Sequence, residues 1–368
     1  MAAVAGFWQP LFGAGAAQGV QVPLRVLRKQ GRPFLALPAG RSLAAATLDL
    51  YPAQTGRARL ARGLLRCLLR AGAPVGTERV SLVLPGDDGL VKFLGAQAGV
   101  APRVPEFGIL AGNPATPGQR FLLLVFDSSQ RPAAVVKAGL SAEAKALIRR
   151  EQAFLEAIGG KAVGVPKLRG ALQTATVEAL ALNYFGGRTP RPRDDGGLAA
   201  LLRGWVDAER AATLSEIPAW QRLERAAAAD PLWPALAGCL RARSLRPVLG
   251  HGDLAPWNIK VSPQGDWTAL DWERGELTGV AGWDWFHYVL QRAILVERLP
   301  AERLVERAAR LLAAEEFKRY GEQTGIAGFA RELLLAYLLY RMHVIQPAAG
   351  IPPTRALAKA LAASWPAT

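Results

Sequence analysis

The stretch from residue 248 to residue 273 restricts the folds open to this chain more than any other part of it. It reads Val-Leu-Gly-His251-Gly-Asp253-Leu-Ala-Pro-Trp-Asn258 and, further on, Leu-Asp271-Trp-Glu273. Asp253 and Asn258 are five residues apart, so a single tight loop can turn both side chains to the same side. Alternation across residues 259–261, with Pro263 and Gly265 beyond, predicts a short hairpin that ends near Asp271. The segment therefore predicts a loop and a hairpin that gather two carboxylates and one amide.

These residue types suit the transfer of a phosphoryl group. That reaction needs a carboxylate near the acceptor hydroxyl and a magnesium ion on the phosphate oxygens. Magnesium prefers hard oxygen ligands, which Asn258 and Asp271 carry. His251 is expected to brace the loop by hydrogen bonds rather than to transfer protons. Asp284 either ties back to this loop or caps the helix that begins near it.

Glu151 is the most informative residue outside this segment. Ser141 is predicted to cap a helix in which Leu147, Ile148, Phe154, Leu155 and Ile158 form an apolar stripe. Glu151 falls within that stripe, where a carboxylate is costly unless a cation pairs with it. Lys137, at the end of the strand predicted before the helix, is the natural partner. The alternative is that Glu151 lies at the edge of the stripe and reaches water.

Composition limits the classes of protein that fit. Only two cysteines, Cys67 and Cys239, are present and they lie far apart, which excludes a disulfide framework and fits a reducing cytoplasm. The longest uncharged stretch, Met1 to Leu24, is interrupted by prolines and glutamines, so we expect neither a signal peptide nor a transmembrane segment. The net charge of +15 favours anionic partners such as nucleotides, although an arginine-rich solvated surface is the alternative.

The charge is concentrated near the N-terminus, where residues 1–105 hold 13 Lys or Arg and 4 Asp or Glu. We expect these residues to form a basic extension with strands over 33–38 and 79–84. Residues 56–70 are expected to form a helix with five leucines on one side: Leu60, Leu64, Leu65, Leu68 and Leu69. A core helix with a charged outer face is the favoured interpretation. Contact with a membrane surface or an acidic partner is the alternative.

Beyond residue 106, strands come first and helices later, which predicts an α+β protein with two lobes and a cleft between them. Strands are expected over 121–126, 133–136 and 177–182. The segment Asn183 to Gly187 is expected to form the hinge between the lobes. The chain divides accordingly into an N-terminal extension (1–105), an N-lobe (106–185) and a mostly helical C-lobe (186–368).

Residues 106–345 resemble the aminoglycoside phosphotransferase and choline kinase family, relatives of the protein kinases. The His251-Gly-Asp253-x4-Asn258 and Asp271-Trp-Glu273 segments carry the resemblance. It implies a protein-kinase-like fold that binds ATP and Mg²⁺, with Asp253 as catalytic base and Asn258 and Asp271 as magnesium ligands. It also implies that Lys137 contacts phosphate, that Glu151 holds Lys137, and that the backbone around Asn183 meets the nucleotide base.

One departure from the family pattern lies in residues 107–118, which contain Gly108, Gly112 and Gly118 but no Gly-x-Gly-x-x-Gly. Pro114 and Pro117 lack the N–H groups that would hold phosphates there.

The site residues and the resemblance together predict an ATP- and magnesium-dependent kinase. It is expected to act on a hydroxyl of a sugar, a sugar derivative or an amino alcohol, with no nucleic-acid partner. The alternative is a non-catalytic, kinase-shaped protein that docks an acidic partner through its basic N-terminal region.

Overall fold

The chain folds into two compact units. The computed structural model describes residues 6–13, 19–73, 75, 78–112, 118–191, 194–345 and 351–363. The strand-rich unit comprises Met1–Gly160 and Pro166–Gly186, and the helical unit comprises Lys161–Val165 and Gly187–Thr368. Strands dominate the first unit and helices the second, which confirms the predicted α+β class.

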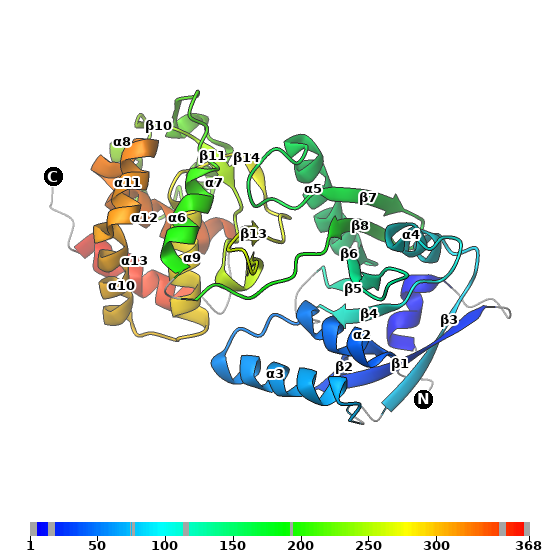
Figure 1. Ribbon diagram of the computed structural model, residues 1–368. Helices are drawn as coiled ribbons and strands as arrows, with labels where there is room; N and C mark the ends of the chain where they lie inside the picture. Colours follow the sequence, from blue (N-terminus) through cyan, green and yellow to red (C-terminus); the bar gives the residue numbers. More distant parts are fainter. Residues whose placement is uncertain are drawn as a thin grey trace. The chain divides into compact units, whose positions relative to one another are not determined.

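One eight-stranded sheet forms the centre of the strand-rich unit, in the order β3-β1-β2-β4-β5-β6-β8-β7 (Figure 1). Each pair of neighbours is antiparallel. The strands are β1 (Val20–Lys29), β2 (Arg32–Pro38), β3 (Glu78–Leu84), β4 (Phe107–Ala111), β5 (Arg120–Phe126), β6 (Pro132–Gly139), β7 (Leu168–Gln173) and β8 (Glu178–Asn183). Residues before 106 thus supply three strands of the same sheet that carries Lys137 and Asn183, and the division into units does not separate them from it.

The apolar run of β5 is explained by burial on both faces of the sheet. Phe121, Leu123 and Val125 enter one core cluster, whereas Leu124 and Phe126 enter another. Successive side chains of a strand point to opposite faces, so each cluster covers one face.

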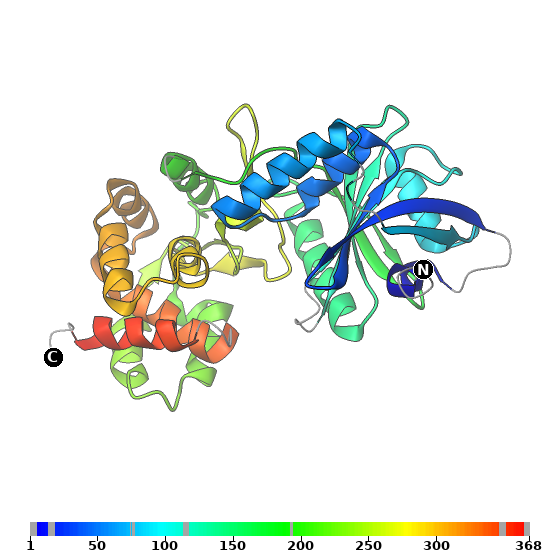
Figure 2. The ribbon, with the colours of Figure 1, turned by 90° about the horizontal axis from the view of Figure 1, so that it is seen from below.

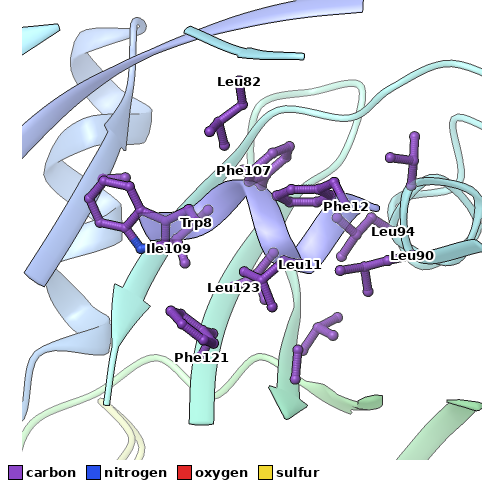
Figure 3. Close-up of a cluster of buried hydrophobic side chains, with 14 of the residues drawn as sticks. Trp8, Leu11, Phe12, Leu82, Leu90, Leu94, Phe107, Ile109, Phe121 and Leu123 are labelled. Atoms are coloured by element: carbon purple, nitrogen blue, oxygen red, sulfur yellow. The ribbon is translucent and has the colours of Figure 1, made fainter. Parts of the chain in front are cut away.

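The first cluster is closed by η1 (Gln9–Phe12) and α4 (Gly89–Ala98). Figure 3 shows Phe12 beside Phe107 of β4, with Leu90 and Leu94 of α4 on the other side of Phe12. The Phe12 and Phe107 ring centroids are 5.7 Å apart. Residues near the N-terminus therefore complete the core of the sheet.

The second cluster is covered by α2 (Arg41–Thr47), η2 (Leu48–Leu50) and α3 (Gly56–Arg70). A Cβ atom on Gly108 would collide with the side chain of Thr47 in α2. Position 108 therefore requires a glycine because α2 packs closely against β4 there.

The favoured interpretation of residues 56–70 as a core helix with a charged outer face is wrong. Leu69 is fully buried, but Leu60, Leu64 and Leu68 are 77%, 64% and 39% exposed. The side of α3 that faces the unit carries Arg66, which forms an ion pair with Asp49. Leu65 and Leu69 pack on the second core cluster, whereas the other three leucines of the predicted side are exposed.

The helical unit contains eight α-helices among its described residues and three two-stranded sheets, β9–β10, β11–β14 and β12–β13. The helices are α6 (Asp195–Arg203), α7 (Pro218–Ala226), α8 (Trp233–Leu240), α9 (Trp283–Leu295), α10 (Ala301–Ala313), α11 (Glu315–Thr324), α12 (Ala330–Tyr340) and α13 (Ile351–Ala363). The strands are β9 (Ala212–Thr213), β10 (Ser244–Leu245), β11 (Val248–Gly250), β12 (Ile259–Val261), β13 (Trp267–Ala269) and β14 (Glu276–Gly279). No helix in the described ranges combines the length and the apolar character needed to cross a bilayer.

Candidate active site

A buried ion pair joins Lys137 of β6 to Glu151 of α5 (Ala142–Ile158) in the strand-rich unit. The Lys137 Nζ atom lies 2.7 Å from each carboxylate oxygen of Glu151. Glu151 is 0% and Lys137 7% exposed. The Ser141 hydroxyl accepts a hydrogen bond from the backbone N–H of Ala144 and starts the helix as predicted. The predicted pairing is confirmed, although β6 continues two residues past Lys137, to Gly139.

Asp284, in the first turn of α9, holds the loop that begins at His251. Its Oδ2 atom accepts the backbone N–H of His251 at 2.6 Å, and its Oδ1 atom accepts that of Gly252 at 3.0 Å. The cap position of α9 is occupied by Gly282. Of the two roles considered for Asp284, the structure therefore shows the tie to the loop.

His251 is fully buried and fixes the loop from within. Its Nε2 atom lies 2.9 Å from the carbonyl oxygen of Leu270, and its Nδ1 atom accepts the backbone N–H of Asp253 at 3.3 Å. The ring also packs on Trp272, with centroids 4.6 Å apart. One imidazole thus connects the loop to the segment that carries Asp271, which is the bracing role expected of it.

His287 is a residue of this site that the sequence analysis missed. Its Nε2 atom lies 3.0 Å from Oδ1 of Asp253, an approach close enough for contact but not aligned as a linear hydrogen bond. His287 follows Asp284 by three residues, so both side chains point from the same side of α9. That spacing within a helix after the loop is the signal that could have revealed it.

A polar chain continues behind His287. The Tyr337 hydroxyl lies 3.0 Å from Nδ1 of His287, and Arg341 Nη1 donates to the same hydroxyl at 3.4 Å. Arg341 also bonds to Gln291. Since Arg341 only donates, the Tyr337 hydroxyl can give its own proton to Nδ1, and His287 then presents Nε2–H to Asp253.

Burial and neighbouring charges set the protonation of the pair. Burial raises the pKa of the Asp253 carboxyl, but His287 and the positive charge of Arg274 outweigh it and bring that pKa below its ordinary value. Burial lowers the pKa of His287, and Asp253 only partly opposes this. At neutral pH the pair is therefore a carboxylate beside a neutral imidazole. A third of the Asp253 side chain remains exposed, so the carboxylate can meet a substrate.

The hairpin β12–β13 brings Asn258 and Asp271 to the same end. Ile259 pairs with Ala269, and the backbone N–H of Leu270 donates to the carbonyl oxygen of Asn258 at 2.7 Å. Asp271 adopts φ 74°, a left-handed conformation that aspartate tolerates better than most residues and that recurs at functional sites.

Asn258 also contacts the loop. Its Nδ2 atom donates to the carbonyl oxygen of Asp253 at 2.9 Å and lies 3.4 Å from Oδ2 of the same residue. This orientation makes Oδ1 the atom that can meet a cation. The side-chain oxygens of Asn258 and Asp271 are of the type that a hard divalent ion prefers. Among the described residues there is no cluster of three His, Cys, Asp or Glu that could hold a metal ion.

Asn183, predicted to lie where the nucleotide base binds, is the last residue of β8, and its side chain is exposed. In the glycine-containing segment 107–118, the backbone N–H of Gly112 donates a hydrogen bond to the carbonyl oxygen of Arg120 at 2.8 Å. Pro114 and Pro117 lie outside the described residues. The predicted site residues thus form two groups, Lys137, Glu151 and Asn183 in the strand-rich unit and Asp253, Asn258 and Asp271 in the helical unit. That these two groups converge stays a prediction.

No family model matches the chain, and no curated protein matches it. Among solved structures it is similar to an ethanolamine kinase of Plasmodium vivax at 13% identity, over 92% of this chain and 96% of that chain, with a TM-score of 0.43. It is similar to a putative fructosamine-3-kinase of Haemophilus somnus at 13% identity, over 74% and 96%, with a TM-score of 0.43. An aminoglycoside phosphotransferase of Streptomyces rimosus matches at 14% identity, over 68% and 95%, with a TM-score of 0.42.

These similar structures are named as kinases or phosphotransferases. At such identities and scores the likeness does not specify a reaction or an acceptor. Both follow, as proposals, from the residues of this chain.

Proposed function

We propose that the chain is an ATP- and magnesium-dependent phosphotransferase that phosphorylates a hydroxyl group of a small molecule. The arrangement around Asp253 is the observation that supports this most. An ionised carboxylate, partly exposed, lies between the imidazole of His287 and the amide of Asn258, on a loop held by Asp284. Such a group is suited to accept the proton of an attacking hydroxyl.

The remaining residues take complementary roles. Asn258 and Asp271 would hold Mg²⁺, which supplies charge neutralisation on the phosphate oxygens. Lys137, kept in place by Glu151, would contact the nucleotide phosphates, and the backbone near Asn183 would meet the base. These roles require the two groups of residues to meet around one nucleotide.

The acceptor class we propose is a sugar, a sugar derivative or an amino alcohol. A net charge of +15 disfavours a strongly cationic acceptor such as an aminoglycoside, because like charges repel at long range. The experiment is a nucleotide-consumption screen of the full chain across neutral sugars, amino sugars, amino alcohols and aminoglycosides, with the Asp253→Asn variant as the blank. We expect turnover with at least one acceptor of the first three classes.

Nucleotide binding is tested separately by thermal shift with ATP, with and without magnesium. We expect a rise in the melting temperature that requires magnesium. No response to ATP, together with no turnover, would favour the alternative of a kinase-shaped docking protein.

A further inference from the structure

Helix α3 presents an apolar stripe to solvent. Leu60, Leu64 and Leu68, four residues apart and therefore on one side of the helix, are 77%, 64% and 39% exposed. The helix lies beside α2 in the strand-rich unit (Figure 2). Three adjacent exposed leucines differ from the single apolar residues scattered over ordinary surfaces, and such patches mark interaction sites.

The outward direction of this stripe is fixed by polar contacts on the other side of α3. Arg66 pairs with Asp49, whose second oxygen accepts the Tyr184 hydroxyl at 3.1 Å. Arg62 Nη1 donates to the carbonyl oxygen of Tyr51 at 2.9 Å. Rolling α3 to bury the leucines would break these contacts and expose Leu69, which is fully buried. The orientation is thus built into the fold.

Charge identifies the chemistry of the partner. Helix α3 carries five arginines and no acidic residue, and Arg57, Arg59 and Arg70 are exposed. A second copy of α3 packed against the stripe would bring arginines against arginines, which disfavours a homodimer. The surface instead complements an apolar layer bordered by negative charge.

The leucine spacing and the neighbouring surface favour lipid over a helical protein partner. A coiled-coil seam alternates steps of three and four residues, whereas these leucines follow steps of four and four. Next to the stripe, Ala61 of α3 lines a pocket of about 180 Å³, and Phe34, Tyr51 and Leu65 also line it. Acyl chains can cover a convex stripe and fill an adjoining hollow without a preformed match in shape.

We propose that α3 docks the protein on an anionic lipid surface. Leu60, Leu64 and Leu68 enter the boundary between headgroups and acyl chains, while the exposed arginines bind lipid phosphates. This inference does not depend on the proposed kinase activity, since none of these residues belongs to the candidate active site.

The test is co-sedimentation of the full chain with vesicles of phosphatidylcholine alone or of an equimolar mixture of phosphatidylcholine and phosphatidylglycerol. We expect binding to the mixed vesicles only, weakening as salt rises. The triple variant Leu60→Ser, Leu64→Ser, Leu68→Ser should bind roughly tenfold more weakly or not at all. The matched control Leu277→Ser, at a 54% exposed leucine of the helical unit, should bind like the unaltered protein.

A second variant separates the charge from the leucines. Arg57→Gln, Arg59→Gln and Arg70→Gln together should lower binding to mixed vesicles and flatten its salt dependence, with the circular dichroism spectrum unchanged because these side chains are exposed.

Three results would overturn the proposal. The first is that the unaltered protein fails to bind mixed vesicles. The second is that the leucine variant binds them as well as the unaltered protein does, because binding would then reflect only the general attraction of a basic protein. The third is a concentration-dependent dimer that the leucine substitutions abolish without any vesicle binding, which would assign the stripe to a second copy.

Discussion

Both carboxylate oxygens of Glu151 lie 2.7 Å from the ammonium of Lys137, in a position from which water is almost excluded. The pair connects β6 to α5, and along the chain these two elements are joined only by the short segment from Gly139 to Ser141. A buried pair of this kind stabilises little relative to apolar residues of similar size, but each member is costly without the other. The presence of the pair is therefore better explained by the use of Lys137 than by stability.

The single change Lys137→Met should destabilise the strand-rich unit by about 3 kcal/mol, because it leaves a buried carboxylate uncompensated. The double change Lys137→Met, Glu151→Leu should recover most of that loss. Hydrogen exchange of the β5 and β6 amides measures both. If Lys137 contacts phosphate, neither variant should show the ATP-dependent thermal shift.

The exposed pair Arg28–Glu78, at 2.7 Å in the same sheet, is the matched control. Arg28→Met should cost far less than Lys137→Met, since solvent already screens the exposed pair. Equal losses for Arg28→Met and Lys137→Met would show that burial does not govern the energetics of the Lys137 pair.

His287 should act on turnover through Asp253. His287→Leu removes the N–H that faces the carboxylate and should lower kcat about tenfold with little change in KM for the acceptor. His287→Gln keeps a donor of similar reach and should restore part of the rate. His343→Gln, at a histidine bonded to Asp230, is the control and should leave kcat unchanged. A rise in KM with kcat unchanged, or no rescue of kcat by glutamine, would contradict this role.

Local patterns predicted five of the eight strands of the main sheet, β2, β3, β5, β6 and β8, together with the Ser141 cap and the Lys137–Glu151 pair, because each depends on residues near in sequence. Strands β1, β4 and β7 were not predicted. Gly108 was grouped with a phosphate loop because its true constraint, Thr47, lies in a distant segment. The orientation of α3 failed for the same reason: Asp49, outside the helix, draws Arg66 inward, against the leucine pattern. His287 was missed although its spacing of three residues from Asp284, in the helix after the loop, was a signal in the sequence. Contacts between distant segments decide what the sequence pattern alone leaves open.

Acid should weaken the helical unit through His251. Burial lowers the pKa of His251 from 6.5 to about 4, so the unfolded chain takes up this proton at a higher pH than the folded one. The stability contributed by neutral His251 is complete above pH 6.5 and is lost as the pH falls towards 4, by about 3 kcal/mol. The buried carboxyl of Asp284 acts oppositely, since burial raises its pKa to about 7 and stability is lost as the pH rises from 3.8 to that value.

A variant isolates the histidine contribution. His251→Gln should be less stable than the unaltered protein at pH 7, and that deficit should shrink by about 3 kcal/mol at pH 4. Urea unfolding followed by tryptophan fluorescence measures it, because every tryptophan except Trp8 lies beyond residue 186. A deficit that stays constant with pH would refute the burial of a neutral imidazole.

Asp253 and Asn258 should fail in different ways when changed. Asp253→Asn removes the proton acceptor but keeps the shape of the side chain, so kcat should fall at least about 100-fold while the magnesium-dependent thermal shift with ATP persists. Asn258→Ala removes an oxygen ligand, so its activity should require more magnesium and recover in part at high magnesium. Titrating turnover against magnesium for both variants separates a base from a ligand. Recovery of Asp253→Asn at high magnesium would exchange the two assignments, because a missing proton acceptor cannot be replaced by more cation.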